Sequence, residues 1–306
     1  MKILVIGGTG HVGAFLVPML LEQGHEVYVG TRGTRAPHTG EDALKGAKFV
    51  ICNGSDIESL KALRSYHFDA VVEFPGHIAN VWEAFKDNVG HIVACGSLWM
   101  FGYPRVVPTP EQYQGECPFD GYAKRYAQMR EMIAQSGMDK AVFTAIMPPN
   151  ICGPGKIPLD CLGGRDIEQH KAHQAGKTVY LPDGPEVLLS PCDAEDIAAL
   201  FALAINNRTA AAGQIFNVGP ADSAVTSREL VRLFGEIYDT EIPVETVSWD
   251  TYRNEISPGV GWWWHFYAHM APDISKARTL LGYEPQYTVK ETLARAVDWM
   301  RDSGLL

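Results

Sequence analysis

The first thirteen residues constrain the fold most strongly, because a short aliphatic strand runs directly into three glycines spaced three residues apart. The strand covers residues 3–6, and the glycines are Gly7, Gly10 and Gly13. This spacing allows a tight turn, a close backbone approach to a ligand and close packing of the next helix on the sheet. Free N–H groups at His11 and Val12 then face an anion, so the stretch predicts a turn that binds a dinucleotide pyrophosphate.

Apolar runs alternate with helical segments through the first half of the chain, which predicts an α/β fold built on a doubly wound parallel sheet, the Rossmann arrangement. We expect strands at 26–29, 49–52, 70–74, 91–95 and 142–147, and helices at 57–64, 78–87 and 122–136. After Pro148, clusters of glycine and proline separate shorter segments, as is typical of a lobe with functional loops.

The predicted domain organisation follows from this change of texture. Residues 1–150 form the dinucleotide-binding Rossmann domain, and parts of 190–220 complete its sheet through a helix at 194–205 and a strand at 215–218. Residues 151–306 form mainly a smaller C-terminal substrate-binding lobe.

Composition limits the partners that the protein can have. The balance of 26 basic against 36 acidic residues gives a formal net charge of −10, which disfavours nucleic acid or an anionic membrane as partner. The six cysteines include no C-x-x-C pair, so neither a zinc knuckle nor a disulfide framework is expected. With no apolar run of about 18 residues and no leader before the glycines, we expect a cytoplasmic protein that acts on a small molecule.

The segment after the second strand bears on the choice of cofactor. Enzymes that prefer NAD usually place an acidic residue there for the ribose hydroxyl, whereas this chain has Arg32. A guanidinium suits a 2′-phosphate, so NADP is the first choice and NAD the second, unless Arg32 is only a solvated loop residue. Asp56 follows the third strand and is either a contact to the adenine, the N-cap of the next helix, or both.

Together these features resemble the extended short-chain dehydrogenase/reductase family, often called the NAD-dependent epimerase/dehydratase family. The resemblance covers nearly the whole chain. Its landmarks are the glycine turn, Gly96-Ser97 at a strand end with Tyr122 25 residues further on, and the segments 147–155, 193–198, 216–219 and 273–285. By this resemblance the cofactor contacts also include Phe74, Pro75, Gly76, Pro148 and Asn150.

The resemblance implies a catalytic pair. Ser97 would hydrogen-bond the reacting oxygen, while the phenol of Tyr122 gives or takes its proton during hydride transfer. Such a pair is needed because an alkoxide cannot build up in an apolar pocket without a nearby donor. The alternative is that Tyr122 is an aromatic residue at a helix start that packs on the sheet.

The chain departs from the family four residues after Tyr122, where the family has lysine and this sequence has Tyr126. That lysine anchors the nicotinamide ribose and lowers the pKa of the phenol. Lys124 should point elsewhere, since two residues correspond to roughly 200° around a helix. Three interpretations stay open: another cation is recruited, Tyr126 acts as a second hydroxyl in catalysis, or redox chemistry has been lost.

A second departure concerns the substrate. Members acting on nucleotide sugars carry an arginine shortly before the 193–198 landmark, and here residues 186–191 contain none. Arg165, Lys156 or Arg253 could substitute, but the loss favours a smaller or more apolar ligand. Aromatic residues support that choice, either as pocket walls or as packing at an interface. The expected substrate residues are Trp99, Met100 and His265, with further aromatic residues at 101 and 262–267.

No metal centre is expected. His265 with His269, and His170 with His173, have helical spacings that can bind a metal, but neither pair has the adjacent acidic residue of an H-E-x-x-H motif. The alternative is that these are surface or pocket histidines.

The sequence therefore predicts an NAD(P)-dependent oxidoreductase that transfers hydride on a carbonyl or secondary alcohol of a small sugar-like or aromatic molecule. One alternative is an epimerase or dehydratase that keeps its cofactor tightly bound, and another is a catalytically altered regulatory protein that senses NAD(P). A homodimer is expected by resemblance. Met129, Met132 and Ile133 would suit either its interface or an ordinary core stripe.

Overall fold

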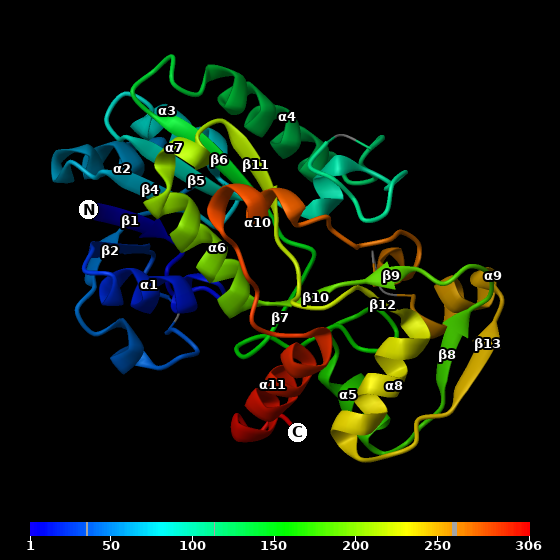
Figure 1. The fold of residues 1–306 in the computed structure, drawn as a ribbon. Coiled ribbons are helices and arrows are strands. Elements are labelled where there is room, and N and C mark those ends of the chain that lie inside the picture. The colour runs from blue at the N-terminus through cyan, green and yellow to red at the C-terminus, as the bar shows by residue number, and fades with distance from the viewer. Residues whose placement is uncertain (35, 113, 259–261) are drawn as a thin grey trace.

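A seven-stranded sheet forms the centre of the larger lobe in the computed structural model, which describes residues 1–34, 36–112, 114–258 and 262–306 (Figure 1). The strands are β1 (Lys2–Ile6), β2 (Glu26–Thr31), β3 (Lys48–Ile51), β4 (Ala70–Glu73), β5 (His91–Cys95), β6 (Val142–Met147) and β11 (Gln214–Asn217). All neighbouring pairs are parallel, in the order β11-β6-β5-β4-β1-β2-β3. The order reverses direction at β1, so the crevice between β1 and β4 is the place where such sheets bind ligands.

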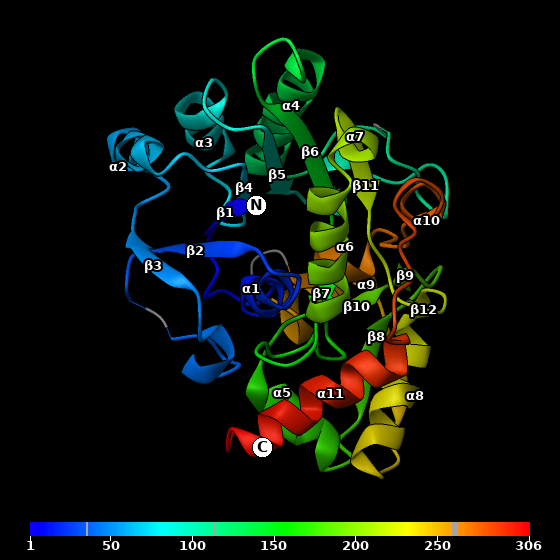
Figure 2. The ribbon, with the colours of Figure 1, turned by 60° about the vertical axis from the view of Figure 1, so that its left-hand side comes forward.

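Helices cover both faces of this sheet, which confirms the predicted doubly wound arrangement (Figure 2). On one face lie α1 (Gly13–Glu22), α6 (Ala194–Asn206) and α10 (Ser275–Leu281), and on the other α2 (Ile57–Lys61), α3 (Ile78–Phe85) and α4 (Asp120–Gln135). Short 3-10 turns lie at Glu41–Leu44, Ala62–Tyr66 and Leu98–Phe101, and the short helix α7 (Arg208–Ala211) precedes β11. The first helix begins at Gly13, because the glycine turn extends through Val12.

The alternation of side chains in β1 explains why the central strands are apolar throughout. Leu4 and Ile6 point into the core beneath α2, α3 and α4, whereas Ile3 and Val5 point into the core beneath α1 and α6. A parallel strand covered on both faces has no polar side, so a continuous aliphatic run is what the fold requires.

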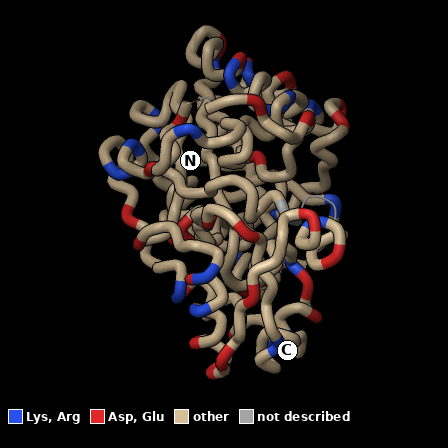
Figure 3. Tube along the Cα trace, turned by 90° about the vertical axis from the view of Figure 1, so that its right-hand side faces the viewer, with Lys and Arg blue, Asp and Glu red and all other residues tan. Residues whose placement is uncertain are grey.

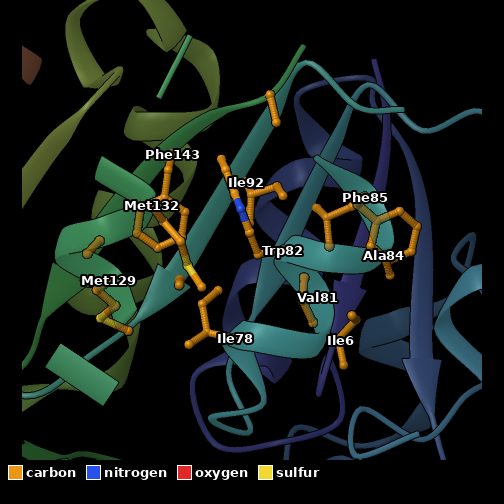
Figure 4. Close-up of a cluster of buried hydrophobic side chains, with 14 of the residues drawn as sticks. Ile6, Ile78, Val81, Trp82, Ala84, Phe85, Ile92, Met129, Met132 and Phe143 are labelled. Atoms are coloured by element: carbon orange, nitrogen blue, oxygen red, sulfur yellow. The ribbon is translucent and has the colours of Figure 1, made fainter. Parts of the chain in front are cut away.

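The apolar stripe of α4 belongs to the first of these cores. Met129 and Met132 are buried and lie toward Phe143 and Ile78 (Figure 4). The sequence allowed this stripe to be either a dimer interface or part of the core. The structure shows that it is part of the core, so Met129 and Met132 are unavailable for a dimer interface.

A smaller lobe packs below the sheet in Figure 1 around a third core. Its helices are α5 (Ile167–Gln174), α8 (Ser227–Tyr238) and α11 (Val289–Asp302), with a short α9 (Trp249–Thr251), a π-helical turn at Tyr252–Ile256 and a 3-10 turn at Trp262–Phe266. Its strands form three pairs: β7 (Asn150–Cys152) with β10 (Pro191–Asp193), β8 (Val179–Pro182) with β13 (Val244–Val247), and β9 (Leu188–Leu189) with β12 (Val225–Thr226).

The last helix illustrates how local sequence fixes an element of this lobe. Thr288 caps α11 by accepting a hydrogen bond from the backbone N–H of Glu291, whose carboxylate accepts one in return from the N–H of Thr288. This capping box satisfies two N–H groups that the helix itself leaves unpaired. The helix then buries Leu293, Val297 and Met300 against α8 and β10.

Charged side chains of both signs are scattered over the chain trace (Figure 3). All six cysteines are free thiols, and five of them are buried. Among the described residues, no helix has the length and apolar character needed to cross a membrane.

Candidate active site

The glycine turn is held closed by its own backbone. Gly7 has a φ of 85°, and its N–H donates to the carbonyl of Gly30 on β2 at 3.0 Å, while the N–H of Gly10 donates to the carbonyl of Gly7 at 2.8 Å. A Cβ on Gly13 would overlap the carbonyl oxygen of Gly7 and lie 2.7 Å from the Cα of Gly8. The first turn of α1 therefore packs directly on the loop, which only glycine permits.

This turn offers donors for a phosphate. The backbone N–H groups of His11 and Val12 have no hydrogen-bond partner among the described residues, and no side chain caps the start of α1. Unpaired N–H groups at a helix N-terminus bind anions. The residues present therefore fit the pyrophosphate of a dinucleotide.

His11 ties the turn to the loop that follows β7. Its Nε2 lies 2.8 Å from the carbonyl oxygen of Pro154, which can only accept, so the proton is on Nε2. Burial, together with the charge of Lys156, lowers the pKa of His11 to about 3, and its ring is therefore neutral. The buried Nδ1 is left as an acceptor without a partner in the described structure.

The two residues expected at the adenosine end lie at the ends of neighbouring strands. Asp56 caps α2, accepting hydrogen bonds from the N–H groups of Glu58 at 3.0 Å and Ser59 at 3.4 Å, so the N-cap interpretation is confirmed. Arg32 follows β2, is exposed, and has no ion pair or hydrogen bond with the other described residues. Its guanidinium is therefore available to a ligand.

The segment after β4 lies against the glycine turn. A Cβ on Gly7 would meet Pro75 at 3.2 Å and Phe74 at 3.4 Å. Gly76 has a φ of 92°, and a Cβ there would overlap Nη1 of Arg125. The structure thus places the expected cofactor residues 74–76 beside the expected phosphate site.

A cavity of about 230 Å³ gathers many of the predicted site residues at the carboxyl edge of the sheet. Ser97 and Tyr122 line it together, and so do Pro148, Asn150 and the substrate candidates Trp99 and His265. The other lining residues are Gly96, Pro149, Ile151, Lys156 and Arg165. The proposed catalytic pair and the proposed substrate residues therefore share one space.

A second cavity of about 380 Å³ adjoins the first through Trp99, Tyr122 and His265, and its remaining walls are Phe119, Gly121 and Trp264. Its aromatic walls suit an apolar part of a ligand. The side chains of Trp262 and Trp263 fall outside what the structure describes. A more open hollow of about 520 Å³ beside α8 contains none of the predicted site residues.

Two predicted residues lie away from the cavities. Met100 is fully buried in the core beneath α4. Tyr126 is also buried, with its ring 5.5 Å from that of Phe101 and the guanidinium of Arg130 at 6.0 Å. The structure therefore does not bring Tyr126 to the cavity that holds Ser97 and Tyr122.

Arg125 was missed by the sequence reasoning: it contacts Tyr122 but lines neither of the two cavities, and lies instead in a separate hollow with Gly76 and Lys124. Its guanidinium carbon lies 5.4 Å from the ring centroid of Tyr122, and its Nε is buried without a hydrogen-bond partner in the described part of the chain. The signal was the i, i+3 spacing, which places Arg125 and Tyr122 on the same face of a helix.

Glu73 was missed as well. It ends β4 with no exposed surface, and its Oε1 accepts hydrogen bonds from the N–H groups of Gly76 at 2.5 Å and His77 at 2.7 Å. Its Oε2 is buried and without a partner among the described residues. Burial raises the pKa of Glu73 to about 7, although these hydrogen bonds and the nearby Arg125 act in the opposite direction.

Three of the four histidines in the candidate metal pairs make hydrogen bonds within the protein, and the fourth, His265, lines the cavities. His170 lies 2.9 Å from the hydroxyl of Tyr238 and 3.2 Å from the carbonyl of Pro158, while His173 accepts the N–H of Cys161 at 3.2 Å. His269 accepts the N–H of Leu188 at 3.0 Å. In the described ranges, no group of three metal-ligating side chains comes together.

A doubly wound parallel sheet, a glycine turn at its switch point and a Ser–Tyr pair at the same edge define a Rossmann protein of the extended short-chain dehydrogenase/reductase type. The chain belongs to the NmrA-like family, whose model matches residues 1–299. This confirms the resemblance to the extended short-chain dehydrogenase/reductase, or epimerase/dehydratase, family that was drawn from the motifs.

Among its relatives, the chain is similar to a dTDP-6-deoxy-L-talose 4-dehydrogenase (NAD(P)(+)) from Kitasatospora kifunensis, at 25% identity over 313 residues that cover 95% of this chain and 93% of that protein. It is also similar to a UDP-glucose 4-epimerase from Lactobacillus helveticus, at 24% identity over 342 residues, covering 98% and 97% of the two chains. A solved UDP-glucose 4-epimerase from Stenotrophomonas maltophila, with bound NAD and formylated UDP-arabinopyranose, shares the fold with a TM-score of 0.78, 17% identity and 99% coverage of both chains.

Proposed function

We propose that this protein is an NAD(P)-dependent oxidoreductase that transfers hydride to or from a carbonyl or secondary alcohol of a small molecule. The observation that carries the proposal is that Ser97 and Tyr122 line one cavity at the carboxyl edge of the sheet. Lys156, which also lines it, lies near His11 of the glycine turn. An acid/base and an oxygen-binding hydroxyl in one space are what carbonyl reduction requires.

In this proposal Ser97 donates a hydrogen bond to the reacting oxygen, and the phenol of Tyr122 gives its proton to that oxygen or takes it back. The nicotinamide, when bound, supplies or accepts the hydride. Unpaired N–H groups at His11 and Val12 support binding of the pyrophosphate, and the exposed Arg32 supports NADP over NAD through its 2′-phosphate.

Arg125 supplies the positive charge that the lysine supplies in other members of the family. Negative charge that develops on the phenol of Tyr122 is stabilised by a positive charge close to its ring. Tyr126, which occupies the lysine's place in the sequence, packs against Phe101 and does not line the cavity. The loss of the lysine is therefore compatible with retained chemistry.

Two alternative functions remain to be distinguished from this one. An epimerase or dehydratase would use the same residues but would keep its cofactor through the cycle, as the epimerases among the relatives suggest. A regulatory protein that senses NAD(P) is favoured by a different observation, the burial of Tyr126 at the position where the family has its lysine.

The first experiment is to denature freshly purified protein and quantify any nicotinamide dinucleotide released. An empty protein that then binds NADPH reversibly supports the oxidoreductase, and near-stoichiometric release supports the epimerase, the dehydratase or a loaded sensor. A protein that binds no dinucleotide overturns all of them.

Substitution of the catalytic phenol separates an enzyme from a sensor. Tyr122→Phe should abolish turnover of a reducible carbonyl, found by screening, while NADPH binding is retained. Tyr103→Phe is the matched control, because Tyr103 packs on Trp264 and Tyr267 and lines neither cavity. Equal turnover in Tyr122→Phe and wild type would remove Tyr122 from the mechanism.

The proposal includes a cytoplasmic homodimer. The free thiols support the location, and the resemblance alone supports the dimer. Sedimentation equilibrium at micromolar concentration tests the assembly, and a single monomeric species would contradict it.

A further inference from the structure

We propose that Lys156 forms an anion site inside the catalytic cavity and binds a phosphate or carboxylate group there. The role in catalysis rests on the proposed function, whereas the anion site itself can be tested without any turnover.

Lys156 lies on the loop after β7 and lines the cavity that holds Ser97, Tyr122 and Asn150. It is partly buried and has neither an ion pair nor a hydrogen bond within the described structure. A cation withdrawn from water without a partner costs free energy, so such an arrangement is expected where a ligand supplies the partner.

The groups around Lys156 do not neutralise it. Those that face it are Arg165, the thiols of Cys95 and Cys152, and the ring of His11 on the glycine turn. Burial raises the pKa of both thiols to about 12, and His11 is neutral, so none of these groups carries negative charge near pH 7. Burial and the charge of Arg165 accordingly lower the pKa of Lys156 to about 8.

Arg165 adds a second positive charge and holds the loop in place. Its Nη1 donates to the carbonyl of Ile157 at 2.6 Å and its Nη2 to that of Ile151 at 2.8 Å. The acidic group near it is Asp160, which accepts N–H groups from Leu162, Gly164 and Asp166 and does not line the cavity. No acidic side chain is among the described residues that line this space, so its net charge is positive.

The anion has two possible sources with the same chemistry. Lys156 is close to His11 on the turn where a dinucleotide pyrophosphate would lie, and it shares a cavity with the Ser–Tyr pair where a substrate would lie. A diphosphate of the cofactor and an acidic group of the substrate would both be stabilised by Lys156. The second source would make the substrate an anionic carbonyl compound or alcohol.

The test compares wild type with Lys156→Met, Lys156→Arg and the control Lys177→Met, which removes an exposed lysine of the same lobe. Calorimetric titrations use ADP-ribose as the diphosphate probe, and inorganic phosphate and benzoate as probes of a substrate group. Loss of a charge-assisted hydrogen bond should weaken binding about 10- to 100-fold in Lys156→Met. Lys156→Arg and Lys177→Met should bind nearly as wild type does.

The pattern of losses identifies the source. Weaker binding of ADP-ribose alone assigns the site to the cofactor diphosphate, and weaker binding of phosphate or benzoate alone assigns it to the substrate. Weaker binding of both supports one site that the two anions share. Unchanged affinities in a folded Lys156→Met protein, or a wild type that binds none of the probes, would overturn the proposal.

A second measurement does not depend on the methionine variant being stable. Because an anion favours the charged lysine, binding at pH 8 to 9 should take up protons, which calorimetry in buffers of different ionisation enthalpy detects. Lys156→Arg should keep the affinity but lose this uptake, since arginine stays charged. Uptake that persists in Lys156→Arg would assign the proton to another group that lines the cavity and would overturn this part of the proposal.

Discussion

The guanidinium carbon of Arg125 lies 5.4 Å from the ring centroid of Tyr122, its neighbour three residues earlier on α4. The same guanidinium fills the space that a side chain at position 76 would need, beside the segment that covers the glycine turn. Arg125 therefore connects the proposed acid/base with the proposed cofactor site. This contact places a positive charge next to Tyr122, although the lysine that carries this charge in the family is absent from the chain.

Removal of this charge should impair chemistry more than folding. We expect Arg125→Met to lower kcat about 10- to 100-fold, because a unit charge at this distance contributes a few kcal/mol at the effective dielectric of a protein surface. Arg125→Lys should recover most of the loss. Steady-state kinetics on a screened carbonyl substrate measures the effect, with Lys124→Met, an exposed neighbour, as control. Wild-type kcat in Arg125→Met would exclude Arg125 from the mechanism.

Cofactor preference should depend on Arg32. Arg32→Ala is expected to weaken NADPH about 10- to 100-fold, because a charge-assisted bond to the 2′-phosphate is lost, and to leave NADH within about threefold. Binding is followed by nucleotide fluorescence at fixed ionic strength, with Arg301→Ala as a surface control on α11. Equal losses for the two nucleotides would refute the assignment of the 2′-phosphate.

The glycine turn should tolerate no side chain at position 13. Gly13→Ala places a Cβ against the backbone of Gly7 and Gly8, and overpacking of this kind costs about 1–3 kcal/mol. We expect a lower midpoint in urea and loss of dinucleotide binding. Gly121→Ala is the control, because a Cβ there meets nothing within 4 Å. A Gly13→Ala protein as stable as wild type, with full affinity, would contradict this close packing.

The sequence predicted those features that local pattern determines. The glycine spacing, the aliphatic strand before it and the cap at Asp56 each depend on residues within a few positions of one another, and each was found as expected. The strand at 142–147 was predicted at its observed bounds for the same reason.

The missing parts of the site depend on contacts between distant segments. Arg125 matters because of its contact with Tyr122 and its approach to Gly76, and the partners of Arg165 are carbonyls in a loop without periodicity. Tyr126 is the opposite case, a residue that the sequence assigned to the site and that the structure places elsewhere. Its place in the family motif predicted a site residue, but its side chain packs against Phe101 in the core.

Burial raises the pKa of the Glu73 carboxyl from its ordinary 4.5 to about 7. Between these values the unfolded chain has released a proton that the folded protein still holds. The contribution of Glu73 to stability is therefore complete below about pH 4.5 and is lost as the pH rises through 7.

Glu73→Gln removes this dependence, because the amide oxygen can accept the same N–H groups of Gly76 and His77 without ionising. We expect the variant to match wild type near pH 4.5 and to be more stable by about 1–3 kcal/mol at pH 8. Urea unfolding across this range measures the difference, and Glu22→Gln, at an exposed position on α1, should show none. A difference that does not change with pH would mean that Glu73 is already ionised in the folded protein, held by Arg125 in spite of its burial.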